Sequence, residues 1–156
     1  MTEQSDDFAN PLAAIPAAGR IMGLDLGTRT IGVAISDGMR YSATPLETIK
    51  RTKFTADAIR LDQLIAENAI VAVILGLPLN MDGSEGPRVQ STRAFARSLA
   101  QRITLPIAFW DERLSTSAVT RMMIQADMRR DRRAEVVDKL AASYILQGAL
   151  DRLRHA

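Results

Sequence analysis

Two apolar runs near the start of the chain are separated by a short polar turn. The runs cover 20–26 and 30–36, with the turn at 27–29. Glycines and β-branched residues punctuate both runs, which is typical of neighbouring strands of one sheet. Asp37-Gly38 is a two-residue hairpin signal. The pattern therefore predicts a third strand over 39–48, at an edge or irregularity because it contains a proline.

Helical and extended patterns alternate in the rest of the chain. Residues 54–68 place apolar side chains along one helical face, and 70–75 is a continuous apolar run typical of a strand buried on both faces. The remaining elements are expected to be a loop over 76–86, a helix from Pro87 to about 102, a strand over 105–110, a helix from Ser115 or Thr116 to about 125, a charged break over 127–133 and a last helix over 134–153. This order predicts an α/β fold, with a mixed sheet and helices on its faces.

Composition narrows the possible chemistry. The 156 residues suit one domain over 20–156 after a flexible N-terminal tail over 1–19. There is no cysteine, and the single histidine is His155. These counts exclude disulfides, thiolate sites and a histidine cluster, so any metal would be held by oxygen. No apolar run reaches the ~20 residues of a membrane helix, so we expect a cytoplasmic protein with no membrane partner.

Positive charge is concentrated in the middle of the chain. Between Arg88 and Arg133 there are ten arginines, no lysine and four acids, although the net charge of the chain is only +2. A locally basic region is typical of a phosphate-binding surface. A solvated face with ordinary ion pairs would give the same pattern.

Three acids lie in or beside apolar elements. Asp25 is inside the first predicted strand, where an uncompensated carboxylate would be costly. Glu112 follows the strand over 105–110, at the edge where α/β folds build their sites. Asp138 is in line with the apolar stripe of the last helix, and we expect it in the first turn or so, where the helix dipole favours a carboxylate.

Converging carboxylates repel one another, and divalent cations would relieve that repulsion. Oxygen ligands alone favour Mg²⁺ or Mn²⁺. Two such ions about 3.5–4 Å apart can activate a water and stabilise the leaving oxygen in phosphodiester cleavage. Each acid also has a simpler interpretation. Asp25 would accept backbone amides, Glu112 would pair with Arg113 or Arg121, and Asp138 would only favour its helix start.

Four segments occur in the order found in a known family. They are Leu24-Asp-Leu-Gly-Thr-Arg-Thr-Ile-Gly-Val-Ala-Ile-Ser-Asp37, Gly76-Leu-Pro-Leu-Asn-Met-Asp-Gly-Ser-Glu-Gly86, Asp111-Glu-Arg-Leu-Ser-Thr116, and Asp138-Lys-Leu-Ala-Ala142 followed by Ile145-Leu-Gln147. Together they resemble the YqgF/RuvX family, whose members are described as Holliday junction resolvases and as nucleases that mature the precursor of small-subunit ribosomal RNA. The resemblance covers nearly everything after residue 20. It implies a ribonuclease H-like fold with a five-stranded mixed sheet and helices on both faces.

The resemblance also implies an activity, namely metal-dependent hydrolysis of phosphodiester bonds. Asp25, Glu112 and Asp138 would be the catalytic acids and would hold two Mg²⁺ or Mn²⁺ ions. The substrate would be structured nucleic acid, with maturation of the 5′ end of pre-16S rRNA favoured over Holliday junction cleavage. The protein would be a monomer or a homodimer. Junction resolution calls for two active sites and hence for the homodimer.

Candidate nucleic-acid contacts come from the first turn, the 76–86 loop, the following helix and the basic segment before Asp138. They are Arg29, Asn80, Ser84, Arg88, Arg93, Arg97, Arg113, Arg129, Arg130, Arg132 and Arg133. Asp131 interrupts the basic segment, which departs from the family pattern. Two of these features have simpler interpretations: Arg29 as a solvent-exposed residue at a hairpin tip, and Asp82-Gly83 as a plain turn.

Two other function classes share some of these features. Asp-Leu-Gly-Thr after a strand also begins the phosphate loop of actin-like ATPases and sugar kinases, but those proteins enclose the nucleotide between two such domains. A non-catalytic RNA-binding module of the same fold is the other alternative. The presence of all three acids argues against it.

Overall fold

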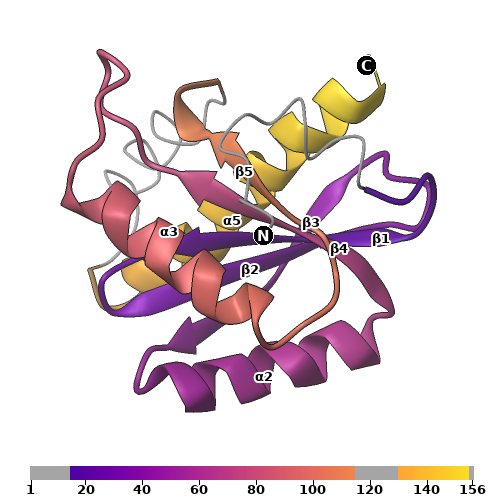
Figure 1. Cartoon of the computed structure of the whole chain (residues 1–156), viewed down its shortest axis with the longest axis horizontal. Coiled ribbons are helices and arrows are strands. Elements are labelled where there is room, and N and C mark those ends of the chain that lie inside the picture. The colour runs from indigo at the N-terminus through magenta and orange to yellow at the C-terminus, as the bar shows by residue number, and fades with distance from the viewer. Residues whose placement is uncertain (1–14, 115–129, 155–156) are drawn as a thin grey trace.

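A computed structural model describes residues 15–114 and 130–154, with the side chains of the last helix from Asp138 onward. The elements in chain order are β1 (Arg20–Leu26), β2 (Thr30–Ser36), β3 (Ala43–Lys50), α2 (Phe54–Glu67), β4 (Ile70–Leu77), α3 (Pro87–Ala100), β5 (Ile107–Asp111), the 3₁₀ turn η1 (Glu112–Leu114) and α5 (Arg130–Arg154). The strands form one sheet in the order β3-β2-β1-β4-β5. Figure 1 shows α2 and α3 on one face of this sheet and α5 on the other. The predicted mixed five-stranded α/β fold is confirmed.

The direction of the strands follows from their connections. β1, β2 and β3 form an antiparallel meander, whereas β4 and β5 run parallel to β1 after helical crossovers. The carboxyl ends of β1, β4 and β5 therefore meet at one edge of the sheet, which is where α/β folds place their sites. Pro45 lies on the edge strand β3 beside a register shift, as its missing N–H requires.

Side chains of alternating residues divide into two apolar cores. Met22, Leu24 and Leu26 of β1 point into the core beneath α2 and α3. Ile21, two residues before Gly23, points to the opposite face and packs with Ile145 of α5 and its neighbours. Ile15 joins this second core although it lies in the segment expected to be a tail. Residues 1–14 are outside the described range.

The expected two-residue hairpin at Asp37-Gly38 is wrong. Six residues connect β2 to β3, which begins at Ala43 rather than at residue 39. The Asp37 carboxylate accepts hydrogen bonds from the backbone N–H groups of Ser42 and Tyr41, both 2.9 Å long, and these bonds lower the pKa of Asp37. Its side chain thus organises a longer loop in which Arg40 adopts a left-handed conformation with φ 63°.

The start of the last helix was also predicted too late. α5 begins at Arg130, inside the segment expected to be a charged break. Arginine and glutamate are good helix formers, so a dense run of charge does not interrupt a helix. Asp138 is therefore in the third turn of α5, and the helix-dipole argument for it fails. The helix expected to end near residue 125 lies outside the described residues.

The described helices also bear on membrane association. None of the helices within 15–114 and 130–154 is long and apolar enough to cross a membrane.

Candidate active site

Asp25 is the centre of a row of residues that crosses the sheet on the α5 face. It is 3% exposed, and its antiparallel partner on β2 is Gly32. On the other side, Leu24 is paired with Leu75 of β4, so the next residue, Gly76, runs alongside Asp25. Both neighbours of the carboxylate on its own face therefore lack side chains.

Gly32 allows the backbone of α5 to reach the sheet beside Asp25. A Cβ atom added at Gly32 would overlap the carbonyl oxygen and carbon of Asp138. The Thr30 hydroxyl, two residues along β2 on the same face, donates a hydrogen bond to the Asp138 carboxylate. Contact with the sheet thus positions the main chain of Asp138, and Thr30 orients its side chain.

Gly76 has the same role for Glu112 on the other side of Asp25. β5 ends at Asp111, and Glu112 opens the short turn η1. Its side chain turns back over the sheet, so that a Cβ added at Gly76 would lie 3.0 Å from Glu112 Oε2 and 3.2 Å from its Cγ. The structure therefore places Asp138 beside Gly32 and Glu112 beside Gly76, on either side of Asp25.

The three acids come from neighbouring elements but do not form a ready-made metal site. Within the described part of the chain, no three His, Cys, Asp or Glu side chains are close enough together to hold one metal ion. The donor set itself, three carboxylates with no nitrogen or sulfur ligand, suits a hard divalent cation such as Mg²⁺ or Mn²⁺. The three side chains would have to move closer together to bind such an ion.

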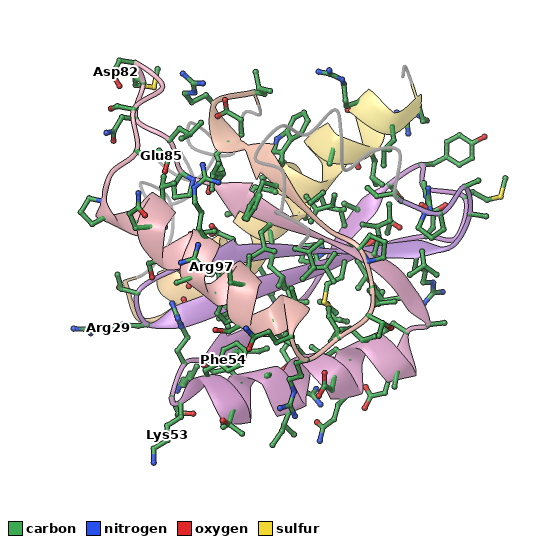
Figure 2. The ribbon with its side chains drawn as sticks, viewed as in Figure 1. Arg29, Lys53, Phe54, Asp82, Glu85 and Arg97 are labelled. Carbon is green, nitrogen blue, oxygen red and sulfur yellow. The ribbon has the colours of Figure 1, made fainter. Side chains whose placement is uncertain are left out.

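The loop that follows β4 forms its own network of hydrogen bonds. Asn80 donates to the Ser84 hydroxyl over 2.9 Å, and that hydroxyl donates to Asp82 over 2.6 Å. The bonds to Ser84 lower the pKa of Asp82. Figure 2 shows Asp82 at the projecting tip of this loop. The turn interpretation of Asp82-Gly83 is thus confirmed, and the polar groups of Asn80 and Ser84 are partly engaged within the turn.

Two of the candidate arginines form ion pairs within the protein. Arg93 contacts Glu85 at 2.5 Å and lies over the Phe109 ring, and burial, with the nearby charge of Arg97 second, lowers its pKa. Arg113 contacts Asp111 at 2.7 Å, which raises the pKa of the guanidinium. These pairs attach the 78–86 loop and η1 to the fold. They also compete with any phosphate for Arg93 and Arg113.

The remaining candidate arginines differ in their accessibility. Arg29 projects from the β1–β2 turn into solvent, and Arg97 is exposed on α3 (Figure 2). Arg88 is exposed at the start of α3 and donates to the Leu26 carbonyl over 3.0 Å. Arg129 and the side chains of Arg130, Arg132 and Arg133 lie outside the described residues.

Sequence reasoning missed the residues that shape this site. Gly32, Gly76 and Thr30 carry no charge, and each acts only through a partner more than thirty residues away. One signal was available. On the α5 face, β2 presents only small side chains and β1 presents Gly23 and Asp25 after Ile21, while the alternate positions of both strands are mostly large, a pattern that indicates a helix packed close to that face.

Sequence comparison relates the chain to a well-populated family. A relative from Cereibacter sphaeroides strain ATCC 17025 is 66% identical over 142 residues, which cover 91% of this chain and 89% of the relative. A relative from Paracoccus denitrificans is 63% identical over 152 residues, or 97% of this chain and 94% of the relative. Each carries the name "Putative pre-16S rRNA nuclease".

Solved structures show the same fold at low sequence identity. Thermus thermophilus RuvC in complex with a Holliday junction substrate is 14% identical and superposes with a TM-score of 0.55, covering 88% of this chain and 98% of that one. The yeast mitochondrial Holliday junction resolvase has a TM-score of 0.50 at 10% identity, covering 95% and 86%. The family model described as "RuvX: Holliday junction resolvase" matches residues 19–152. The chain therefore belongs to the RuvX family.

Proposed function

We propose that this chain is a metal-dependent endonuclease that hydrolyses phosphodiester bonds of structured nucleic acid, and that its substrate is the 5′ end of pre-16S rRNA. The observation that carries the proposal is the row Gly32–Asp25–Gly76, with Asp138 and Glu112 on either side of it. The names of the close relatives support the choice of RNA. We expect the protein to act in the cytoplasm.

Each residue would have a role set by its position relative to the row. Asp25, buried between the two glycines, would hold the metal, and Asp138 and Glu112 would complete its ligands. Bound there, Mg²⁺ or Mn²⁺ would supply activation of a water and stabilisation of the leaving oxygen. The Thr30 hydroxyl keeps the Asp138 carboxylate directed at the row. The exposed Arg29 and Arg97 and the basic segment over 129–133 would attract the phosphate backbone.

Branched DNA is the alternative substrate, and a specific observation favours it. The matching family model is described as that of a Holliday junction resolvase, and the RuvC structure with the same fold contains a junction. A resolvase would need two active sites and therefore a homodimer, whereas a ribosomal RNA nuclease has no such requirement.

The test compares both substrates with purified protein. A labelled precursor rRNA end and a four-way DNA junction are each incubated with Mg²⁺, Mn²⁺ or EDTA. Asp25→Asn serves as the inactive variant. Asp62→Asn, which removes a surface acid paired with Arg102 on the other side of the fold, is the matched control.

The expected result is metal-dependent cleavage of the RNA by the wild type and by Asp62→Asn, with none above background by Asp25→Asn. Cleavage of the junction alone would replace the RNA assignment with that of a resolvase, and sedimentation would then have to show a dimer. Tight binding without cleavage of either substrate would favour the non-catalytic module.

A further inference from the structure

A groove on the α2/α3 side of the sheet lies at the same end of β1 as the acids. Its volume is about 490 Å³. It is lined by Leu26, Gly27, Thr28, Arg51, Thr52, Pro87, Arg88, Ser91 and Thr92. Leu26 faces the core beneath α2 and α3, whereas Asp25 faces α5. The main chain of residues 25–27 therefore separates this groove from the three carboxylates.

Two guanidinium groups are held in the groove by main-chain carbonyls. Arg51 donates to the Gly27 carbonyl over 2.6 Å, and its guanidinium lies over the Phe95 ring with 5.7 Å to the centroid. Arg88 donates to the Leu26 carbonyl over 3.0 Å. A guanidinium has five N–H donors, so each retains donors beyond this bond. Among the described residues, neither group is within 4.0 Å of a carboxylate, unlike Arg93 and Arg113.

The other polar lining groups suit an anion. Thr28, Thr52 and Ser91 are exposed and carry hydroxyls that can donate to a phosphate oxygen. Asp57, a buried acid on α2, accepts from the Thr52 N–H over 3.2 Å but is not part of the lining. The first turn of α3 borders the groove, and its dipole adds to the positive potential of the two arginines.

We propose that this groove binds a second phosphate of the substrate strand, next to the phosphodiester that the acids hydrolyse. Arg51 and Arg88 would grip that phosphate, while Thr28 and Ser91 would donate hydrogen bonds to it. The strand would cross the carboxyl end of β1, with one phosphate on each side of residues 25–27. This inference rests on the proposed nuclease function, because it assigns the groove to the same substrate.

The test measures binding instead of cleavage, so that it does not depend on catalysis. All proteins carry Asp25→Asn, and the probe is the precursor rRNA end. Single 2′-deoxy methylphosphonate linkages, which are neutral, are placed at each position around the cut site. A 2′-deoxy phosphodiester at the same position is the control for the sugar. The junction with single methylphosphonates replaces the RNA if it binds more tightly.

Two substitutions probe the groove. Arg51→Gln keeps an N–H donor for the Gly27 carbonyl but removes the charge, and Ser91→Asp adds a negative charge at an exposed position that cannot disturb the core. Ser98→Asp makes the same change at an exposed position of α3 outside the groove. Arg20→Ala removes one exposed positive charge at the far end of β1.

The parent should lose affinity when one linkage other than the cleaved one is made neutral. In Arg51→Gln that loss should disappear, and the slope of log K against log salt should fall by about 0.7–0.9, the value of one phosphate contact. Ser91→Asp should weaken binding, while Ser98→Asp and Arg20→Ala should not remove the linkage effect. If Arg51→Gln does not fold, the comparison of Ser91→Asp with Ser98→Asp tests the proposal by itself.

The proposal is overturned if the neutral linkage costs the same affinity with and without Arg51, or if Ser91→Asp binds as well as Ser98→Asp. A wild type that never cleaves, together with a linkage effect that depends on Arg51, would refute the nuclease proposal and leave a phosphate-binding groove. The two failures are therefore distinguishable.

Discussion

The two faces of the sheet differ in the size of the side chains they present. The α2/α3 face of β1, β2 and β4 is covered by large apolar residues, among them Met22, Leu24, Leu26, Ile31, Val33, Val73 and Leu75. In the same strands and in β5, the α5 face carries Gly23, Asp25, Gly32, Ala34, Ala72, Gly76 and Ala108, with Ile21, Ile74 and Trp110 as its large residues. Both faces bury apolar area, but only the α5 face has enough small residues to admit a helix backbone close to the sheet.

The two faces therefore contribute differently to the free energy of folding and to the positions of the acids. Each large side chain buried beneath α2 and α3 contributes roughly 1.5–3 kcal/mol. Glycines contribute no such burial, and within a strand they weaken it. Here they permit close contact: a Cβ at Gly23 would lie 2.7 Å from Leu146 Cβ, and one at Gly76 would lie 2.5 Å from Ile145 Cδ1. The close approach of α5 to the sheet thus depends on these glycines.

Of the substitutions on the α5 face, Gly32→Ala should have the largest effect on stability and cleavage. The added methyl group would overlap the main chain of Asp138, which cannot rotate away as a side chain can. We expect overpacking to lower the free energy of unfolding by about 1–3 kcal/mol or more, and cleavage to fall towards the level of Asp25→Asn because Asp138 is displaced. Chemical denaturation and the RNA cleavage assay measure the two effects.

The matched control for that change is Gly38→Ala. Gly38 has nothing within 4 Å of an added Cβ, so the same substitution should leave stability and cleavage unchanged. A Gly32→Ala protein with normal stability and activity would show that α5 does not depend on this contact to position Asp138.

Gly76→Ala should have a smaller effect on stability, because the atoms that its Cβ would meet belong to side chains. Ile145 Cδ1, at 2.5 Å, can move by a change of rotamer, whereas Glu112 Oε2, at 3.0 Å, would be pushed from its place beside Asp25. We expect a modest fall in the melting temperature and a clear fall in cleavage at a given Mg²⁺ concentration.

Adding Ile145→Val separates the two consequences of Gly76→Ala. Valine lacks the Cδ1 atom, so the double variant should recover the stability lost to the clash, apart from the roughly 0.5–1.5 kcal/mol that Ile→Val costs by itself. Cleavage should stay low. Recovery of cleavage in the double variant would mean that the position of Glu112 is not what Gly76 protects.

The sequence predicted the elements of the sheet well because local patterns encode them. β1 and β2 have the bounds that their apolar runs predicted, and α2 and α3 differ from prediction by a residue or two at their ends. Asp25 was found because a carboxylate inside an apolar strand is anomalous in the sequence itself. The α5 start and the 37–42 loop were missed, since a charged run is compatible with helix and the Asp37 side chain bonds to Tyr41 and Ser42 in a loop longer than an Asp-Gly turn.

The accessory residues were predictable only in part, because their roles depend on partners that the sequence does not reveal. The charge of Arg93 and Arg113 predicts phosphate contacts, but the fold brings Glu85 and Asp111 to them. Arg51 is one of three neighbouring basic residues, with Lys50 and Lys53, and nothing in the sequence distinguishes it from them; only folding places it in the same groove as Arg88. Local pattern thus identified the acids, and three-dimensional proximity identified what surrounds them.

Thr30→Val should have a smaller effect than Gly32→Ala or Gly76→Ala, and it should act on metal binding alone. Valine has nearly the shape of threonine but cannot donate the hydrogen bond to the Asp138 carboxylate. Groups that orient metal ligands in this way typically change metal affinity or activity by about 10–100-fold. We therefore expect cleavage by Thr30→Val to need more Mg²⁺, with an unfolding free energy close to that of the wild type. Thr30→Ser keeps the hydroxyl and should restore the Mg²⁺ requirement. Because Gly32 still admits α5 in both variants, a normal Mg²⁺ requirement in Thr30→Val would mean that backbone contact alone positions Asp138, and that the hydroxyl is dispensable.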